Sequence, residues 1–332
     1  MTDPAPTPPP RTPLRRALGF ALGLTLVGAA IYAVARSSTD LSDAYEKVRH
    51  APLWVLVFLL LVPAISWLAT SGALWALTRR FGHVAPAEMG ALVGSAWLLN
   101  YLPLKPGLVG RLAYHKRVNN IPVKHSVRVL VDSVILTTTS SAFVLALALL
   151  LREVAMPLGW QIALVLAPAA ALALACTLRP PGERHGWVLL AALFRYLDVL
   201  VWIARYAAVF YALDDPIGLP EAVLVASASQ LAIAVPLTGN GLGVREWAVG
   251  LTIGATGGGI QLALAADLIN RAAELLVAVP IGLLGARWVA RRHASRRARE
   301  RNRTSPDPVP AGSVGSRDDL AETDQNPGPA NP

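Results

Sequence analysis

The chain has 332 residues, of which 54% are apolar and only 15% are charged, well below the roughly 25% that is usual in soluble domains. Its net charge of +9 does not indicate a nucleic-acid partner, because Lys and Arg are concentrated between apolar blocks and in the C-terminal tail. The single cysteine, Cys176, excludes an intramolecular disulfide and a cysteine-based zinc site. The composition favours an all-α polytopic membrane protein.

The apolar residues form blocks of about twenty residues, the length that crosses a hydrocarbon layer of about 30 Å. They follow a Pro-rich N-terminus, residues 1–14, which we expect to be disordered and cytoplasmic. A membrane domain over residues 15–290 is then predicted to have six transmembrane helices, the first a retained signal anchor: 17–35, 53–77, 127–151, 158–178, 187–213 and about 262–289. Residues 291–332 are predicted to be a cytoplasmic tail, Arg-rich and then disordered.

Two further apolar segments, residues 87–124 and 221–259, are broken at their centres by Pro and Gly. Each is therefore expected to form two short helices joined by a non-helical turn. Non-helical backbone at membrane depth persists only where it is buried in protein or lines a polar cavity. The pattern predicts two broken helical hairpins, and leaves open whether they are re-entrant or fully spanning.

The two broken segments resemble each other in the order of their residues. The matching positions are Glu88 and Glu221, Pro103 and Pro236, Gly110 and Gly243, Arg111 and Arg245, and Asp132 and Asp267. The offset is 133 residues at the glutamates and 135 at the aspartates, so we predict a duplication with copies at about 86–151 and 220–288. Three predicted spans lie between the hairpins, which makes the repeat inverted, as in many transporters that bind substrate at the repeat interface.

The distribution of charge predicts the orientation of the chain in a cell membrane. The N-terminus, Arg79-Arg80, residues 105–128, residues 179–184 and the tail are basic and fall on one side of the predicted topology. Acidic residues collect on the other side, most of all in the stretch 214–221. Because basic loops remain inside, we expect a multi-pass protein with both termini in the cytoplasm.

Charged residues within the apolar blocks are candidates for a functional network, since each costs at least about 2.5 kcal/mol at the bilayer centre unless it is paired or hydrated. These residues are Asp132, Arg195, Asp198, Asp267, Arg271 and Glu274. Asp267, Arg271 and Glu274 share one helix face, and Arg245 or Arg111 from a hairpin would balance their excess negative charge. Two interpretations stay open: the charges pair as interhelical locks, or they line a hydrated path for a polar headgroup.

The hairpin turns are the second candidate site, because Gly-rich turns and helix N-termini bind anions, and phosphate is the obvious anion in a membrane. The candidate headgroup-binding residues are Lys105, Gly107, Arg111, Gly239, Gly241, Gly243, Arg245 and Glu246. We find no catalytic motif and no metal-ligand spacing among the six His, so neither an enzymatic activity, a metal nor a cofactor is expected.

These motifs resemble the membrane domain of lysylphosphatidylglycerol synthases and their stand-alone, flippase-like relatives, over roughly residues 15–290. The first segment carries Pro103, Gly107 and Arg111, and the second carries Pro236, Gly239, Gly241, Gly243, Arg245 and Glu246. In the first segment, Leu108 stands where the family has Glu, and Asp132-Ser133 where it often has Glu-Arg; the later arginine is kept at Arg271. The second segment therefore carries the resemblance more fully.

The resemblance implies movement of a phospholipid or lipid-linked headgroup between leaflets, with a homo-oligomer or a separately encoded lipid-modifying enzyme as further partners. Nothing like the family's soluble aminoacyl-transfer domain follows the membrane domain, so synthesis of a lysyl-lipid is not expected. Two alternatives remain. In the first, the chain is an integral-membrane transferase that uses Asp198, Asp267 and Glu274 on a lipid-linked substrate. In the second, it is a non-catalytic membrane subunit whose basic tail holds anionic lipid.

Overall fold

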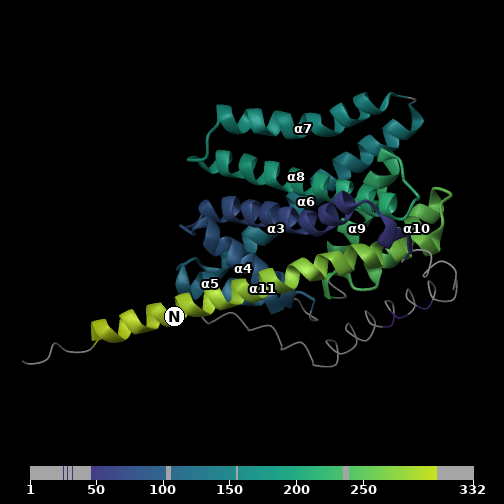
Figure 1. The fold of residues 1–332 in the computed structure, drawn as a ribbon. Coiled ribbons are helices and arrows are strands. Elements are labelled where there is room, and N and C mark those ends of the chain that lie inside the picture. The colour runs from purple at the N-terminus through teal and green to yellow at the C-terminus, as the bar shows by residue number, and fades with distance from the viewer. Residues whose placement is uncertain are drawn as a thin grey trace, which may run out of the picture. The chain divides into compact units, whose positions relative to one another are not determined.

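A computed structural model describes residues 25, 28, 32, 46–101, 106–154, 156–234 and 239–304 of the chain. Within this part the protein is helical, and its only β contact is an isolated bridge between Pro181 and Glu183. The elements are α3 (Leu53–Arg79), α4 (Pro86–Leu99), α5 (Pro106–Val118), α6 (Val123–Glu153), α7 (Leu158–Leu178), α8 (Arg184–Ala212), α9 (Leu219–Ala234), the 3₁₀ turn η1 (Gly239–Gly241), α10 (Val244–Ala255) and α11 (Ile260–Thr304) (Figure 1).

Five of these helices, α3, α6, α7, α8 and α11, are long and apolar enough to cross a membrane. They coincide with five of the six predicted spans; the remaining one, residues 17–35, lies almost entirely outside the described residues. The chain divides into two compact units, Met1–Val289 and Ala290–Pro332. In the second unit the described residues form the last turns of α11, where Arg, Ala and Glu favour the helix.

Each of the two broken segments forms a pair of short helices, α4 with α5 and α9 with α10, and the members of each pair pack against one another. Residues 102–105 and 235–238 lie outside the described part, and with them Pro103, Lys105 and Pro236. The second break is shaped by backbone in the left-handed region at Asn240 (φ 46°), Gly241 (φ 70°) and Gly243 (φ 79°). Glycine and asparagine tolerate this region best, which is why α10 begins only after this turn.

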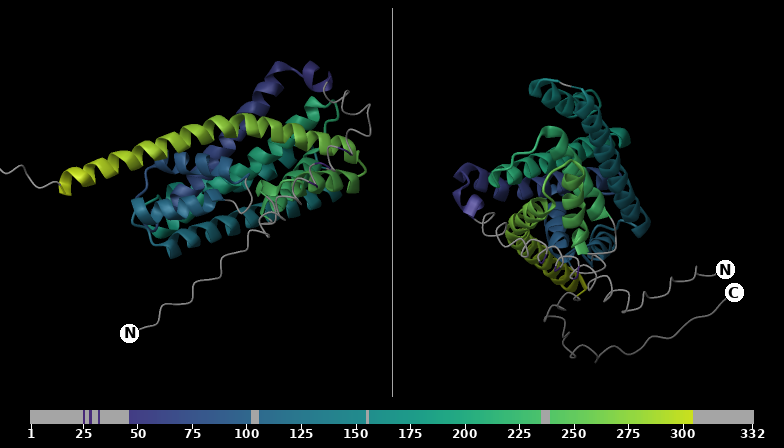
Figure 2. Two further views of the ribbon diagram at one scale, coloured as in Figure 1. Left: turned by 90° about the horizontal axis from the view of Figure 1, so that it is seen from below. Right: turned by 90° about the vertical axis from the view of Figure 1, so that its right-hand side faces the viewer.

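Helix α8 occupies the centre of the first unit, where it packs against α3, α6, α7 and α9. Its buried residues Tyr206, Val209 and Phe210 belong to a core that also includes Val249 of α10 and Leu264 of α11. Helix α7 stands at the edge of the bundle (Figures 1 and 2), and its only buried side chain is Val165. Its many exposed apolar side chains are typical of a surface that faces lipid.

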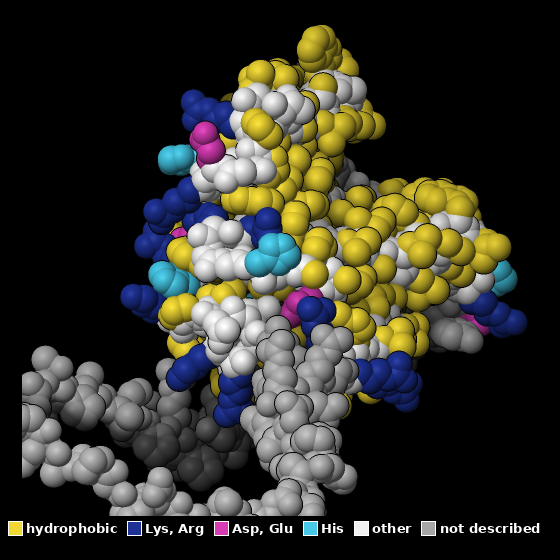
Figure 3. All heavy atoms as spheres, turned by 90° about the vertical axis from the view of Figure 1, so that its left-hand side faces the viewer, with side chains coloured by type: hydrophobic (Ala, Val, Ile, Leu, Met, Phe, Trp, Pro, Cys, Tyr) yellow, Lys and Arg dark blue, Asp and Glu magenta, His cyan; other side chains and the backbone are white. Residues whose placement is uncertain are grey.

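Exposed basic side chains collect at one end of the bundle, where α5 and α7 end and α6 and α8 begin. They are Lys116, Arg117, Lys124, Arg128, Arg179 and Arg184. Figure 3 looks onto this end and shows Lys and Arg in dark blue beside flanks covered with apolar side chains in yellow. Exposed acidic residues, Glu153, Asp214 and Asp215, lie at the opposite ends of α6 and α8. This asymmetry agrees with the charge pattern on which the predicted orientation depends.

Candidate functional site: a polar cavity beside a buried charge network

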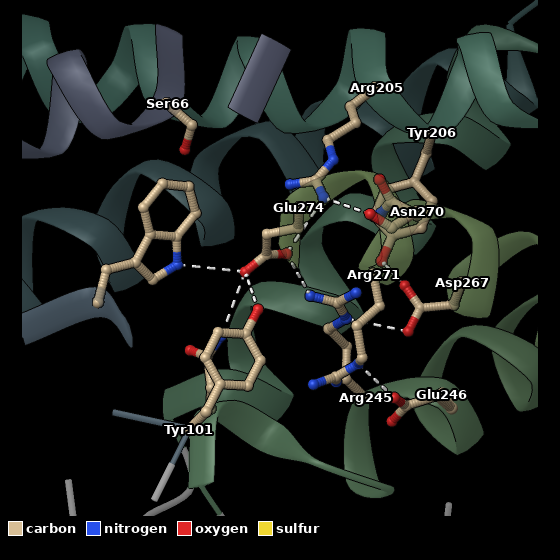
Figure 4. A network of polar contacts seen from close by, with 12 residues as sticks. Ser66, Tyr101, Arg205, Tyr206, Arg245, Glu246, Asp267, Asn270, Arg271 and Glu274 are labelled. Atoms are coloured by element: carbon tan, nitrogen blue, oxygen red, sulfur yellow. Dashed lines mark hydrogen bonds and ion pairs between the residues drawn. The ribbon is translucent and has the colours of Figure 1, made fainter. Parts of the chain in front are cut away.

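Six charged side chains from α8, α10 and α11 form one buried network (Figure 4): Arg205, Arg245, Glu246, Asp267, Arg271 and Glu274. Arg245 donates from Nε to Asp267 Oδ2 and from Nη1 to Glu274 Oε2, both at 2.9 Å. Arg205 Nη2 donates to Glu274 Oε2 at 3.1 Å and to the Asn270 carbonyl at 2.7 Å. The network joins α8 to the consecutive helices α10 and α11.

The remaining pair of the network is Arg271 with Glu246. Arg271 Nε lies 2.5 Å from Glu246 Oε1, with the geometry of an ion pair and not of a directed hydrogen bond. Spacings of four and three residues place Asp267, Arg271 and Glu274 on one face of α11. Glu246 lies in the first turn of α10, where the helix dipole favours a carboxylate.

The network contains three arginines and three carboxylates, so its formal charges balance. Arg245, Glu246 and Asp267 are fully buried, with no exposed surface. Removal of one partner from a buried ion pair costs about 3–5 kcal/mol, because the other charge is left without compensation. This geometry corresponds to the interhelical lock, the first of the two interpretations that the sequence leaves open.

A cavity of about 440 Å³ lies beside the network, lined by residues of α3, α4, α5, α6, α8, α9, η1 and α11. Its lining combines the indole rings of Trp67, Trp97 and Trp202 with a large set of polar side chains. The polar residues are Ser66, Thr70, Asn100, Arg111, Ser133, Thr137, Thr138, Ser141, Arg195, Asp198, Gln230, Asn240 and Glu274. Both broken segments contribute, the first through Asn100 and Arg111 and the second through Gln230 and Asn240.

Both carboxylates that line the cavity are already occupied by donors of the protein. Asp198 accepts hydrogen bonds from Ser66 (2.5 Å) and Thr70 (3.2 Å) and pairs with Arg195 at 3.3 Å. Glu274 accepts from Tyr101 (2.7 Å), Asn240 (3.2 Å) and Trp97 (3.3 Å), besides its two arginines (Figure 4). Neither carboxylate is left to neutralise a further cation.

Arg111 differs from every other charged group of the cavity. It is 7% exposed, yet no carboxylate among the described residues forms an ion pair with it. The nearby guanidinium of Arg195 is also positive and does not neutralise it, and arginine stays protonated in proteins at neutral pH. A buried charge without a counter-charge is costly, and an anionic ligand would remove that cost.

The structure divides the predicted site residues into groups with different surroundings. Arg111, Arg195, Asp198 and Glu274 line the cavity, whereas Arg245, Glu246, Asp267 and Arg271 lie in the buried network. Asp132 lies apart from both, near the basic end of α6, where it pairs with Arg80 and Arg128.

The predicted glycines have backbone roles. Gly107 lies where a Cβ atom would overlap the Ala96 carbonyl of α4. Gly239, Gly241 and Gly243 form the turn before α10, and Lys105 is outside the described residues. The turns therefore bring helices close together, and they place Asn240 at the cavity.

The hydroxyl-bearing residues of the cavity were not predicted from the sequence. Ser133, Thr137 and Ser141 recur every four residues along α6, a spacing that places them on one face. This spacing is the signal that sequence reasoning passed over, because Ser and Thr are also common in membrane helices that bind nothing. Tyr101, Trp97 and Asn240, which hold Glu274, carry no such pattern.

The chain matches no protein-family model and no curated protein. The function must therefore be argued from the geometry of the cavity and from the residues that line it.

Proposed function

We propose that the protein translocates lipids between leaflets, flippase-like, by accommodating an anionic phospholipid or lipid-linked headgroup in the central cavity. The observation that carries this proposal is Arg111, a buried cation that forms no ion pair with any carboxylate of the described residues, in a cavity lined by polar and apolar side chains. A headgroup phosphate supplies the missing negative charge, and the hydroxyl and amide groups around it replace water. The apolar outer surface of the bundle lets the acyl chains remain in the bilayer.

The position of the cavity supports the same proposal. It is lined by both broken segments, and transporters built from inverted repeats bind substrate where broken helices meet. We therefore propose that α4–α6 and α9–α11 are the two copies of an inverted repeat in a six-span membrane domain. The resemblance of residues 236–246 to the membrane domain of lysylphosphatidylglycerol synthases supports this function, and membership of that family is part of the proposal.

Lipid translocation by the purified full-length chain tests the function. In proteoliposomes that contain a fluorescent anionic phospholipid, Arg111→Gln is expected to lower the rate of translocation at least about tenfold, since a lost charge-assisted hydrogen bond is worth about 1.5–3 kcal/mol. The matched control is Arg117→Gln, which removes an exposed arginine from the same helix and should leave the rate unchanged.

Equal rates for Arg111→Gln and the unaltered protein would sink the assignment of the cavity as the headgroup site. Detection of a covalently altered lipid by mass spectrometry of the same vesicles would favour the transferase alternative over translocation. No translocation above protein-free vesicles by the unaltered protein would favour the membrane-subunit alternative.

A further inference from the structure

The charged side chains around the cavity leave one positive charge when each group is counted together with its ion-pair partners. Asp198 is balanced by Arg195, and Glu274 belongs to the buried network, whose three arginines and three carboxylates cancel. Arg111 is the cation that remains among the described residues of the cavity. A ligand that completes this balance carries one negative charge, as a phosphodiester does.

Several hydroxyl groups line the same cavity. Helix α6 presents Ser133, Thr137 and Ser141 at four-residue spacing; Ser133 accepts a hydrogen bond from Arg195, and Thr137 donates one to the Ser133 carbonyl. Ser66 and Thr70 of α3 donate to Asp198, so toward a ligand they act as acceptors. Ser141 is 1% exposed, and its Oγ has no hydrogen-bond partner in the described part of the chain. A buried hydroxyl without a partner is unfavourable, so a ligand hydroxyl that bonds to it is favoured.

We infer that the cavity selects a phosphodiester whose headgroup is uncharged and hydroxylated, such as a glycerol, inositol or sugar unit, over one whose headgroup carries an ammonium group. This inference rests on the proposed function and specifies the substrate class of the same site. The phosphodiester lies at Arg111, and the hydroxylated headgroup lies along the Ser and Thr residues of α6.

The rejection of an ammonium group follows from the same balance of charge. An ammonium group needs acceptors and a counter-charge, and both carboxylates of the cavity are held by other donors. Its positive charge would lie near Arg111 and Arg195, which are 7% and 8% exposed, and like charges repel more strongly where they are buried. A hydroxylated headgroup adds no charge, and serine and threonine side chains both donate and accept hydrogen bonds.

Binding of three lipids with identical short acyl chains tests this inference on the purified full-length protein. The probes are phosphatidylglycerol, phosphatidylmethanol, which has the same charge without the hydroxyl groups, and phosphatidylethanolamine, which carries an ammonium group. We expect phosphatidylglycerol to bind at least about tenfold more tightly than phosphatidylethanolamine, with phosphatidylmethanol between them. Equal affinity for phosphatidylglycerol and phosphatidylethanolamine would overturn the inference.

Variants of the Ser and Thr residues of α6 separate the effect of charge from the effect of hydrogen bonding. Ser141→Ala combined with Thr137→Val should remove the preference for phosphatidylglycerol over phosphatidylmethanol and leave binding of phosphatidylmethanol unchanged. Thr177→Val, on the exposed surface of α7, is the control. Thr138→Glu adds a carboxylate to the cavity lining and should narrow or reverse the preference for phosphatidylglycerol over phosphatidylethanolamine. The assignment would be contradicted if the double variant kept the unaltered ratio of affinities for phosphatidylglycerol and phosphatidylmethanol, and Thr138→Glu kept the unaltered ratio for phosphatidylglycerol and phosphatidylethanolamine.

Two further measurements keep this inference distinct from the proposed function. Loss of translocation in Arg111→Gln without any headgroup preference in the unaltered protein would retain lipid translocation and reject the selectivity. Deacylated glycerophosphoglycerol is expected to bind at least about a hundredfold more weakly than the short-chain lipid, because it lacks the apolar area of the acyl chains. Equal affinity would assign the cavity to a soluble phosphodiester and reject the lipid as the source.

Discussion

Arg111 and Arg245 follow the breaks of their segments in comparable positions, yet their surroundings differ. Arg245 pairs with Asp267 and Glu274 and has no exposed surface. Arg111 forms no ion pair with a carboxylate of the described residues, and Asp132, the counterpart of Asp267 in the sequence comparison, pairs instead with Arg80 and Arg128. One arginine joins helices inside the bundle, and the other presents its charge to the cavity.

The pair of Arg271 with Glu246 is suited to a test of the lock, because neither residue lines the cavity. Arg271→Met should destabilise the protein by about 3–5 kcal/mol, since Glu246 is left as an unpaired buried charge. The double variant Arg271→Met/Glu246→Leu removes both charges and should recover most of that loss. Denaturant unfolding of the purified protein in detergent measures these differences.

The control for this test is Arg49→Met, which breaks the exposed pair of Arg49 with Glu46 and should change stability by no more than about 1 kcal/mol. A double variant as unstable as Arg271→Met alone would show that the two residues do not act as a unit.

At the scale of elements, α4 and α5 of the first broken segment and α9 and η1 of the second contribute to the lining of the cavity. Helices α4 and α5 approach closely because Gly107 has no side chain where it meets the Ala96 carbonyl. Helix α5 is thereby placed so that Leu108 and Arg111 reach the cavity. The position of the unpaired cation thus depends on a glycine one turn away.

This dependence predicts different effects for two glycine substitutions in the same helix. Gly107→Ala should destabilise the protein by about 1–3 kcal/mol, because the new methyl group would overlap backbone atoms of Ala96, which cannot move aside as a flexible side chain can. Gly110→Ala meets no atom within 4 Å and should be neutral or stabilising, by up to about 1 kcal/mol. Thermal unfolding in detergent compares the two, and equal destabilisation would contradict the close approach at Gly107.

At the scale of the whole bundle, one end is basic and the flanks are apolar (Figure 3). A cavity lined by polar and apolar side chains lies among the helices. This arrangement is the one that a bilayer requires, since apolar flanks face the hydrocarbon and positive residues remain on the inner side. We expect the basic end to face the cytoplasm.

Cysteine labelling tests this orientation, and the chain needs only Cys176→Ser to provide a cysteine-free background. Asp215→Cys, at the acidic end, should react with a membrane-impermeant maleimide on intact cells. Lys116→Cys, at the basic end, should react only after the membrane is permeabilised. The reverse pattern would show that the basic end faces outward.

The positions of the membrane helices follow from local features that are legible along the chain. Five apolar blocks of about twenty residues became the five long helices, and residues 87–124 and 221–259 each contain two short helices, as predicted. Left-handed backbone at Asn240, Gly241 and Gly243 separates the second pair, whereas Pro103 and Pro236 lie outside the described residues. Length, apolarity and helix breakers act within one segment, so they do not depend on where other segments lie.

The partners of the charges depend instead on distances between helices. Sequence spacing placed Asp267, Arg271 and Glu274 on one face, and it left both Arg111 and Arg245 as candidates to balance them. Packing of α10 against its neighbours brings Arg245 to these carboxylates, whereas α5 carries Arg111 to the cavity. Electrostatic energy falls with separation and rises with burial, so only the tertiary arrangement decides which arginine is neutralised and which remains to meet an anion.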